Sequence, residues 1–100
     1  MLIYKIVTAE QWRAAKVTGV FTGAPIDVTD GYIHFSTRGQ VDGTLAKHFA
    51  GQTELLLVTV DGDQFGDVLR WELSRGGELF PHLYAPLPVA AAIAVESVHV

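Results

Sequence analysis

Two short segments of the chain carry most of the side chains that could do chemistry. The first is Asp30–Thr37, in which His34 brings a titratable ring and Ser36 and Thr37 bring hydroxyl groups. A predicted strand ends here at the start of a predicted helix, where free amides and the positive end of the helix dipole favour anions. The segment predicts a pocket for a phosphate, ribose or carboxylate. The alternative is structural: a capping threonine, a turn serine and a hydrogen-bonded histidine.

The second segment is Trp71–Tyr84. Glu72 lies on the polar face of its predicted strand, and Arg75, beside two glycines, has open access to an anionic ligand. In extended geometry one face of this segment presents a ring, an imidazole and a phenol, from Phe80, His82 and Tyr84. Such a face suits the wall of a ligand pocket. The alternative is a hairpin turn at the glycines, followed by an edge strand with packed aromatic side chains.

These residues fall into two groups by chemistry. Histidine exchanges protons near neutral pH, so the candidate catalytic residues are His34 and His82. Hydroxyl, guanidinium and phenol groups bind ligand oxygens, so the candidate substrate-binding residues are Ser36, Thr37, Arg75 and Tyr84. The spacing of His34, His48 and His82 matches no zinc-ligand pattern, and we expect no metal site.

A strand and a helix begin the set of elements that must position these groups. Leu2–Val7 is an apolar run interrupted only by Lys5, which predicts a central or half-buried strand. Thr8 and Gln11 have the spacing of a capping box, so a helix is expected to follow and to stop at Gly19.

The segment around His34 is expected to run from loop to strand to helix. Glycine, proline and Asp-Gly breakers predict an irregular stretch over Val20–Asp30. A strand follows at Gly31–Phe35, with Ile33 and Phe35 toward the core. Its wetter face carries Tyr32, His34 and Ser36. A second helix is expected over Arg38–Ala50, because Thr37 and Gln40 repeat the capping-box spacing.

The rest of the chain predicts further strands, at Glu54–Val60, Val68–Ser74, Leu79–Tyr84 and Ile93–Val100. The first of them is a near-continuous Leu, Val and Thr run, which indicates a strand covered on both faces. Pro81 indicates an edge strand or a bulge. Trp12 and Trp71 are expected as core anchors. The element order favours one α+β domain over residues 1–100, with a mixed, largely antiparallel split sheet and two short helices.

Composition limits the classes of partner. The chain has 100 residues and a net charge of −4, which argues against a nucleic-acid-coating protein because such binding needs a basic surface. No apolar window approaches the roughly 20 residues of a membrane span, so no membrane partner is expected. The absence of cysteine fits a cytoplasmic location. A small-molecule ligand is the expected partner, and the sequence names no protein partner.

Several strings together resemble the domain of unknown function 952 family. The resemblance covers essentially the whole chain, and its most specific parts are Asp30–Thr37 and Leu79–Tyr84. Supporting matches are Ile3–Ile6, Trp12, Ala15, Gly19, Gln40, Trp71, Glu72, Gly77, Pro86 and Leu87.

This resemblance implies a fold similar to that of the ADP-ribosyltransferases, in which a split sheet surrounds an NAD cleft. NAD or ADP-ribose are then the implied ligands. The first-strand position that holds the nicotinamide ribose corresponds to Lys5, where relatives often carry histidine. The second-strand position corresponds to Tyr32–Thr37, and Glu72 is the nearest candidate for the late glutamate of those enzymes.

Three functions follow from these observations. The first is a cleft that binds a nucleotide or another phosphate-bearing small molecule between the two segments. The second is a non-catalytic binding or accessory module, since no complete catalytic set is present. The third is a histidine-dependent phosphoesterase, because His34–Ser36 fits a His-apolar-Ser element and His82–Tyr84 resembles a second copy with tyrosine in the hydroxyl position.

Overall fold

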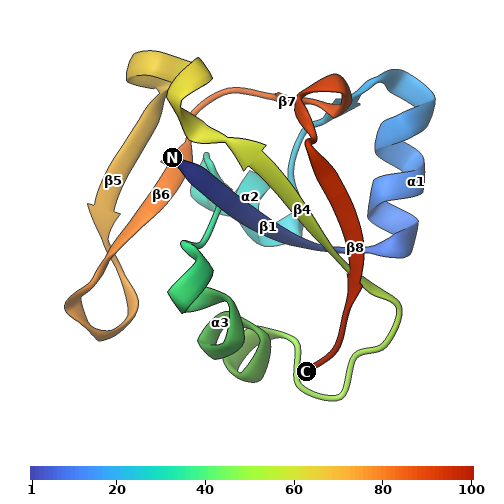
Figure 1. The fold of residues 1–100 in the computed structure, drawn as a ribbon, viewed down its shortest axis with the longest axis horizontal. Coiled ribbons are helices and arrows are strands. Elements are labelled where there is room, and N and C mark those ends of the chain that lie inside the picture. The colour runs from blue at the N-terminus through green and yellow to red at the C-terminus, as the bar shows by residue number, and fades with distance from the viewer.

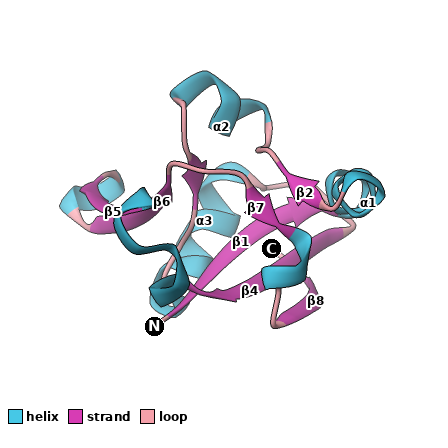
Figure 2. Ribbon diagram, turned by 90° about the horizontal axis from the view of Figure 1, so that it is seen from above, coloured by secondary structure: helices cyan, strands magenta, loops and turns pink.

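All the strand pairings are antiparallel, and the strands form three small sheets, β1–β4–β8, β2–β7 and β3–β6–β5. The computed structural model describes residues 1–100 (Figures 1 and 2). The strands are β1 (Leu2–Thr8), β2 (Val20–Phe21), β3 (Ile33–His34), β4 (Leu55–Asp61), β5 (Leu69–Leu73), β6 (Leu79–Leu83), β7 (Leu87–Pro88) and β8 (Ala94–Val98). The α-helices are α1 (Ala9–Thr18), α2 (Pro25–Asp30) and α3 (Val41–His48). Short 3₁₀ helices span Arg38–Gln40, Gly62–Val68, Arg75–Gly77 and Val89–Ala91.

The predicted α+β class and the largely antiparallel pairing are confirmed. The mixed sheet is wrong, because no parallel pair occurs, and there are three α-helices where two are expected. A single bridge between Tyr4 and Ser36 joins β1 to the segment that follows β3. None of the helices has the length and apolar character needed to cross a bilayer.

Helix α1 begins and ends where the sequence predicts. The Thr8 side chain accepts a hydrogen bond from the Gln11 amide at 3.0 Å, and the Gln11 side chain accepts one from the Thr8 amide at 2.9 Å. Gly19 ends the helix with a φ of 86°, a left-handed conformation that suits glycine. Trp12 anchors the helix in the core, as expected.

The stretch expected to be irregular, Val20–Asp30, contains both β2 and α2. Its signals are present in the sequence. Pro25 occupies the first helical position, Asp27 lies at the third, and Gly31 ends the helix in a left-handed conformation. The glycine and proline breakers are therefore the boundaries of a short helix rather than signs of a loop.

The sheet β1–β4–β8 is covered on both faces. Val58 and Val60 of β4 join the larger core cluster, whereas Leu55 and Leu57 pack in a second cluster with α3. This confirms the covered strand that the apolar run predicts. Ile33 also enters the larger cluster, as its place on the strand predicts.

Strand β6 departs from the prediction, because Pro81 lies in the central strand of its sheet. The Pro81 carbonyl accepts a hydrogen bond from the Phe35 amide at 2.9 Å, just beyond the end of β3. The nitrogen and carbonyl of a strand residue face the same neighbour. The missing N–H therefore faces the side on which β3 has already ended, and the β5–β6 ladder loses no donor.

Trp71 is not a core anchor. Its side chain is 39% exposed on β5, and Leu73 on the same face is 71% exposed. The strand has the predicted alternation, but of its apolar face only Leu69 packs against the core, while Glu72 on the other face contacts His82 of β6. Figures 1 and 2 show why: β5 and β6 form an arm on the opposite side of the molecule from α1, and no helix covers β5.

Candidate functional site

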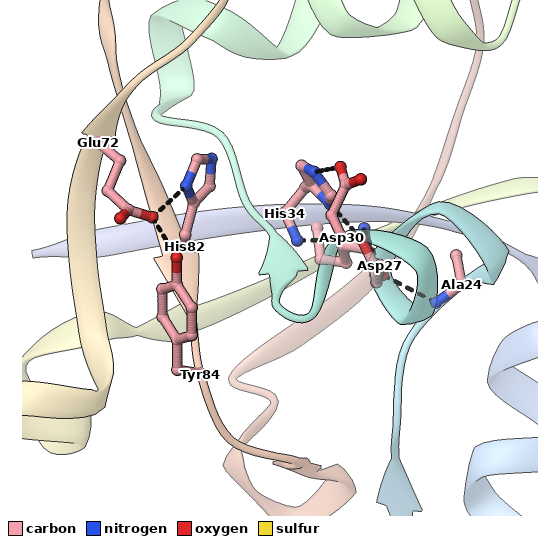
Figure 3. Close-up of polar contacts among 8 residues, drawn as sticks. Ala24, Asp27, Asp30, His34, Glu72, His82 and Tyr84 are labelled. Carbon is pink, nitrogen blue, oxygen red and sulfur yellow. Dashed lines mark hydrogen bonds and ion pairs between the residues drawn. The ribbon is translucent and has the colours of Figure 1, made fainter.

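The two candidate catalytic histidines lie side by side. His34 on β3 is paired in register with His82 on β6, and their ring centroids are 5.4 Å apart. The pairing brings together two segments that are far apart in the sequence. Figure 3 shows that each ring points to its own carboxylates, on opposite sides of the pair.

His34 has both ring nitrogens occupied. Nδ1 lies 2.6 Å from Asp27 Oδ1, and Nε2 lies 2.9 Å from Asp30 Oδ2, both carboxylates belonging to α2 (Figure 3). An ionised carboxylate only accepts hydrogen bonds. The two bonds therefore coexist only when each nitrogen of His34 carries a proton, and a ring held in this way has no lone pair free for a ligand.

Asp27 is the centre of a buried polar cluster. Its carboxylate accepts hydrogen bonds from the Lys5 ammonium and from the amides of Ala24 and His34. Burial by itself raises the pKa of Asp27, but the hydrogen bond from the His34 ring and the charge of Lys5 outweigh it and hold that pKa below its ordinary value. The buried carboxylate is thus kept ionised.

Lys5 lies in the middle of β1, with only 5% of its surface exposed. Its Nζ is 3.0 Å and 3.1 Å from the two oxygens of Asp27. Burial lowers the pKa of Lys5, and the charge of Asp27 opposes that shift. The lysine that interrupts the apolar run is therefore a buried partner of α2, and it fixes that helix against β1.

His82 has a different environment. Its Nδ1 is 2.8 Å from Glu72 Oε1, and the same oxygen accepts a hydrogen bond from the Tyr84 hydroxyl at 2.7 Å (Figure 3). The hydrogen bond from Tyr84, followed by that from His82, lowers the pKa of Glu72. An ionised Glu72 requires the proton on Nδ1 of His82. Nε2 has no hydrogen-bond partner, and it is not sealed from solvent, since no buried side-chain nitrogen is left unpaired.

Tyr32 packs against the rings of both histidines and of Tyr84. Its ring is stacked on His82 at 4.2 Å and tilted against His34 at 4.6 Å and Tyr84 at 5.1 Å between centroids. Burial is the main cause that raises the pKa of Tyr32. This aromatic contact fixes the orientation of the His82 ring from one face, while Glu72 fixes it from the edge.

A pocket of about 490 Å³ opens in front of these residues. Arg75 lines it, with Nη1 3.3 Å from the Thr44 hydroxyl and the guanidinium 5.0 Å from the Phe80 ring. No carboxylate lies within 4.0 Å of that guanidinium. Burial, followed by the positive charge of Arg75, lowers the pKa of His48 on the same wall. The pocket wall therefore carries an unneutralised cation.

The pocket brings together four of the six candidate residues, His34, Ser36, Arg75 and His82. The other two, Thr37 and Tyr84, lie outside its lining. The Thr37 amide donates to the Gln40 side chain at 3.0 Å at the start of the 3₁₀ turn, and the Tyr84 hydroxyl donates to Glu72 at 2.7 Å. The Ser36 hydroxyl is hydrogen-bonded to that of Thr44 at 3.0 Å.

The carboxylates that hold His34 are the main group that the sequence does not reveal. Asp27 and Asp30 are three residues apart on α2, in the stretch that glycine and proline residues predicted to be irregular. The spacing of Pro25, Asp27 and Gly31 is the signal that could have found them. His34, His48 and His82 do not converge with carboxylates into a group of three or more metal ligands.

Comparison with known proteins places this geometry in a family. The family model described as a protein of unknown function (DUF952) matches residues 6–95. The chain belongs to the DUF952 family. This confirms the resemblance to that family that Asp30–Thr37 and Leu79–Tyr84 carry.

Three solved structures of one protein resemble this fold. The crystal structure of protein CC0527 from Caulobacter crescentus is 44% identical, with a TM-score of 0.96, and the match covers 100% of this chain and 88% of that one. A crystal structure of its double mutant gives the same values. The solution NMR structure of CC0527 is 44% identical, with a TM-score of 0.88 over 99% of this chain and 85% of that one. Comparison with curated proteins gives no match.

Proposed function

We propose that the pocket binds a phosphate-bearing small molecule, with a nucleotide such as NAD or ADP-ribose as the leading class. The observation that carries the proposal is Arg75. Its guanidinium lines the pocket, has no carboxylate partner, and makes its one hydrogen bond to the Thr44 hydroxyl. A guanidinium group can donate two parallel hydrogen bonds to one phosphate group. An arginine without a carboxylate partner within the protein remains free to do so.

The rest of the lining suits the ring of such a ligand. The pocket volume of about 490 Å³ lies within the range of about 300–1,000 Å³ common for small-molecule sites. Its aromatic walls come from Tyr4, Tyr32, Phe35, Phe49 and Phe80. A planar base can stack on such rings while its phosphate contacts Arg75.

The proposal includes an ADP-ribosyltransferase-like arrangement of the cleft. In that arrangement Lys5 occupies the first-strand position and Tyr32 the nicotinamide wall, and both residues line the pocket. Glu72 would be the late glutamate, but its Oε1 is already bonded to His82 and Tyr84. The arrangement therefore favours ligand binding over activation of an acceptor by Glu72.

Isothermal titration calorimetry with ADP-ribose, NAD, AMP and inorganic phosphate tests this proposal. We expect binding of at least one nucleotide and a loss of at least about tenfold in affinity in Arg75→Met, because a charge-assisted hydrogen bond contributes roughly 1.5–3 kcal/mol. Arg13→Met, on the exposed side of α1, is the matched control and is expected to bind normally. No binding of any of the four at millimolar concentration would contradict the proposal.

A second candidate function is proton transfer by His82. Glu72 holds Nδ1, and Nε2 is left without a partner in a pocket that Arg75 also lines, which are the conditions for a general base or acid acting on an anionic substrate. In hydrolysis of a 2′,3′-cyclic nucleotide, His82 Nε2 would take a proton from water as its oxygen bonds to phosphorus and one ring P–O bond breaks. The proton would then pass to the leaving ribose oxygen.

This candidate is tested by turnover of a 2′,3′-cyclic nucleotide. We expect turnover to disappear in His82→Gln and to persist at a reduced rate in His34→Gln, because only His82 has a free nitrogen. Binding without turnover in the native chain would leave a non-catalytic binding module and would overturn this second candidate only.

A further inference from the structure

Strand β5 (Leu69–Leu73) is an edge strand with an uncovered outer side. Its only strand partner is β6, and Figure 1 shows it as the outermost strand on that side of the molecule. Edge strands commonly prevent pairing with another chain by charged side chains, of which lysine is the most common, by proline, or by a bulge. The sequence of β5, Leu-Arg-Trp-Glu-Leu, contains no proline or lysine, and its two charges have opposite signs.

One face of this strand is apolar and exposed. Trp71 is 39% exposed and Leu73 is 71% exposed, and the cross-strand partner of Leu73, Leu79, is 51% exposed. The other face carries Arg70 and Glu72. Glu72 bonds His82, and the Arg70 guanidinium lies 4.4 Å from the Tyr84 ring, so both charged residues are on the site face.

The hydrogen bonds to β6 identify which backbone groups of β5 are free. The Tyr84 amide donates to the Val68 carbonyl at 2.7 Å, and the Ser74 amide donates to the Glu78 carbonyl at 2.9 Å. Because the bonding side alternates along a strand, Arg70 and Glu72 also face β6. The outward backbone groups therefore belong to Leu69, Trp71 and Leu73. The Leu69 amide is used by the Gly66 carbonyl, and the other outward groups are open.

The strand is complementary to itself in one register. If two copies of β5 pair antiparallel about a two-fold axis at Trp71, Arg70 of each copy lies opposite Glu72 of the other. Trp71 then meets Trp71, and Leu69 meets Leu73. A residue whose backbone groups point outward can pair only with another such residue. The nearest alternative registers are therefore shifted by two residues. One slip places Arg70 opposite Arg70 and the other places Glu72 opposite Glu72, and both are repulsive.

We propose that β5 binds β5 of a second copy of this chain, which joins two β3–β6–β5 sheets into one six-stranded antiparallel sheet. Two backbone hydrogen bonds join the Trp71 residues, and each Leu73 amide donates to the Leu69 carbonyl of the other copy. The exposed apolar faces of the two β5–β6 hairpins, one from each copy, become continuous. Arg70 of the second copy then lies beside Glu72, the residue that orients His82. The interface is independent of which ligand the pocket binds.

Analytical ultracentrifugation of the whole chain tests this interface. We expect a concentration-dependent species of twice 10.9 kDa. Arg70→Glu replaces two attractive cross-strand pairs with repulsive ones, and Trp71→Thr removes the central contact while keeping a residue suited to strands. Each is expected to weaken dimerisation by at least about tenfold. The combined variant Arg70→Glu with Glu72→Arg restores opposite charges and is expected to recover the dimer.

Val17→Thr is the matched control, because this apolar side chain is 84% exposed on α1, away from β5 (Figure 1). It is expected to leave the association unchanged. Circular dichroism verifies that each variant is folded. A monomer at all concentrations up to millimolar would overturn the proposal, as would a dimer that is insensitive to both Arg70→Glu and Trp71→Thr.

Discussion

His34 and His82 lie opposite each other on β3 and β6, and carboxylates hold both rings. His34 is bound at Nδ1 by Asp27 and at Nε2 by Asp30, so no nitrogen is left for a ligand. His82 is bound only at Nδ1, by Glu72. The number of carboxylate partners, rather than the residue type or its place on the strand, separates a histidine held at both nitrogens from one with a free nitrogen.

The carboxylates in the two histidine clusters, called here the Asp27 arm and the Glu72 arm, also differ in burial. The arm around Asp27 includes the buried ammonium of Lys5 and joins β1, α2 and β3. Glu72 is 38% exposed and touches only His82 and Tyr84, although the His82 ring itself is buried. We therefore expect changes in the first arm to affect folding and changes in the second to affect chemistry.

The largest expected effect is that of Asp27→Ala. It leaves the buried Lys5 ammonium without a counter-ion and removes an acceptor from two amides, so we expect a loss of about 3–5 kcal/mol of stability. Urea unfolding measures it. Glu72→Ala is the matched change in the other arm and is expected to shift the midpoint much less. Equal shifts in the two variants would contradict the division of the arms.

The stability of the chain in acid depends on the ionisation of Asp27. The pKa of Asp27 lies below its ordinary value of 3.8, so the folded state binds that proton less tightly than the unfolded chain does. The resulting stabilisation is complete above about pH 3.8 and is lost as the pH falls through the folded-state pKa. Carboxyl carbon NMR titration should give Asp27 a midpoint below 3.8. A midpoint at or above that value would show that the buried pair does not hold the carboxylate ionised.

Gly43→Ala is expected to separate binding from stability. A Cβ at this position of α3 would lie 3.0 Å from Nη2 of Arg75, so the guanidinium must shift by a few tenths of an ångström, which strains its hydrogen bond to Thr44. Alanine at a compatible helical position otherwise stabilises by about 0.4–1 kcal/mol. We expect nucleotide affinity to fall severalfold while the unfolding midpoint holds or rises. Unchanged affinity would show that nucleotide binding does not depend on the position of the Arg75 guanidinium.

The smallest expected effect is that of Tyr84→Phe. The hydrogen bond from Tyr84 is the largest cause that lowers the pKa of Glu72, so its loss should move that pKa up toward the ordinary value of 4.5. Carboxyl carbon NMR measures the change, and Tyr4→Phe, in which the lost hydroxyl does not touch Glu72, is the control. A Glu72 midpoint that does not move would show that the shared oxygen is not the contact that orients His82.

Much of the fold follows from local sequence signals. The capping box at Thr8, the covered strand β4 and the alternation that buries Ile33 all depend on patterns within a few residues. The exposure of Trp71 does not, because alternation shows that a strand has an apolar face but not whether another element covers it. Pro81 is similar: its place in a central strand depends on where β3 ends.

The candidate site divides in the same way. The convergence of His34, Ser36, Arg75 and His82 on one pocket follows from the two polar segments and their strand faces. The roles of the two histidines do not, because Asp27, Asp30 and Glu72 reach them through tertiary packing. A sequence identifies a titratable ring, but its partners determine which of its nitrogens remains free.

Long-range ¹H–¹⁵N NMR of the imidazole nitrogens, recorded with and without ADP-ribose, tests the central claim most directly. We expect the ¹⁵N resonance of His82 Nε2 to shift when the ligand is added, whereas both nitrogens of His34 keep their shifts because Asp27 and Asp30 still hold them. A shift at the His34 nitrogens with His82 unchanged would contradict the assignment of the two rings.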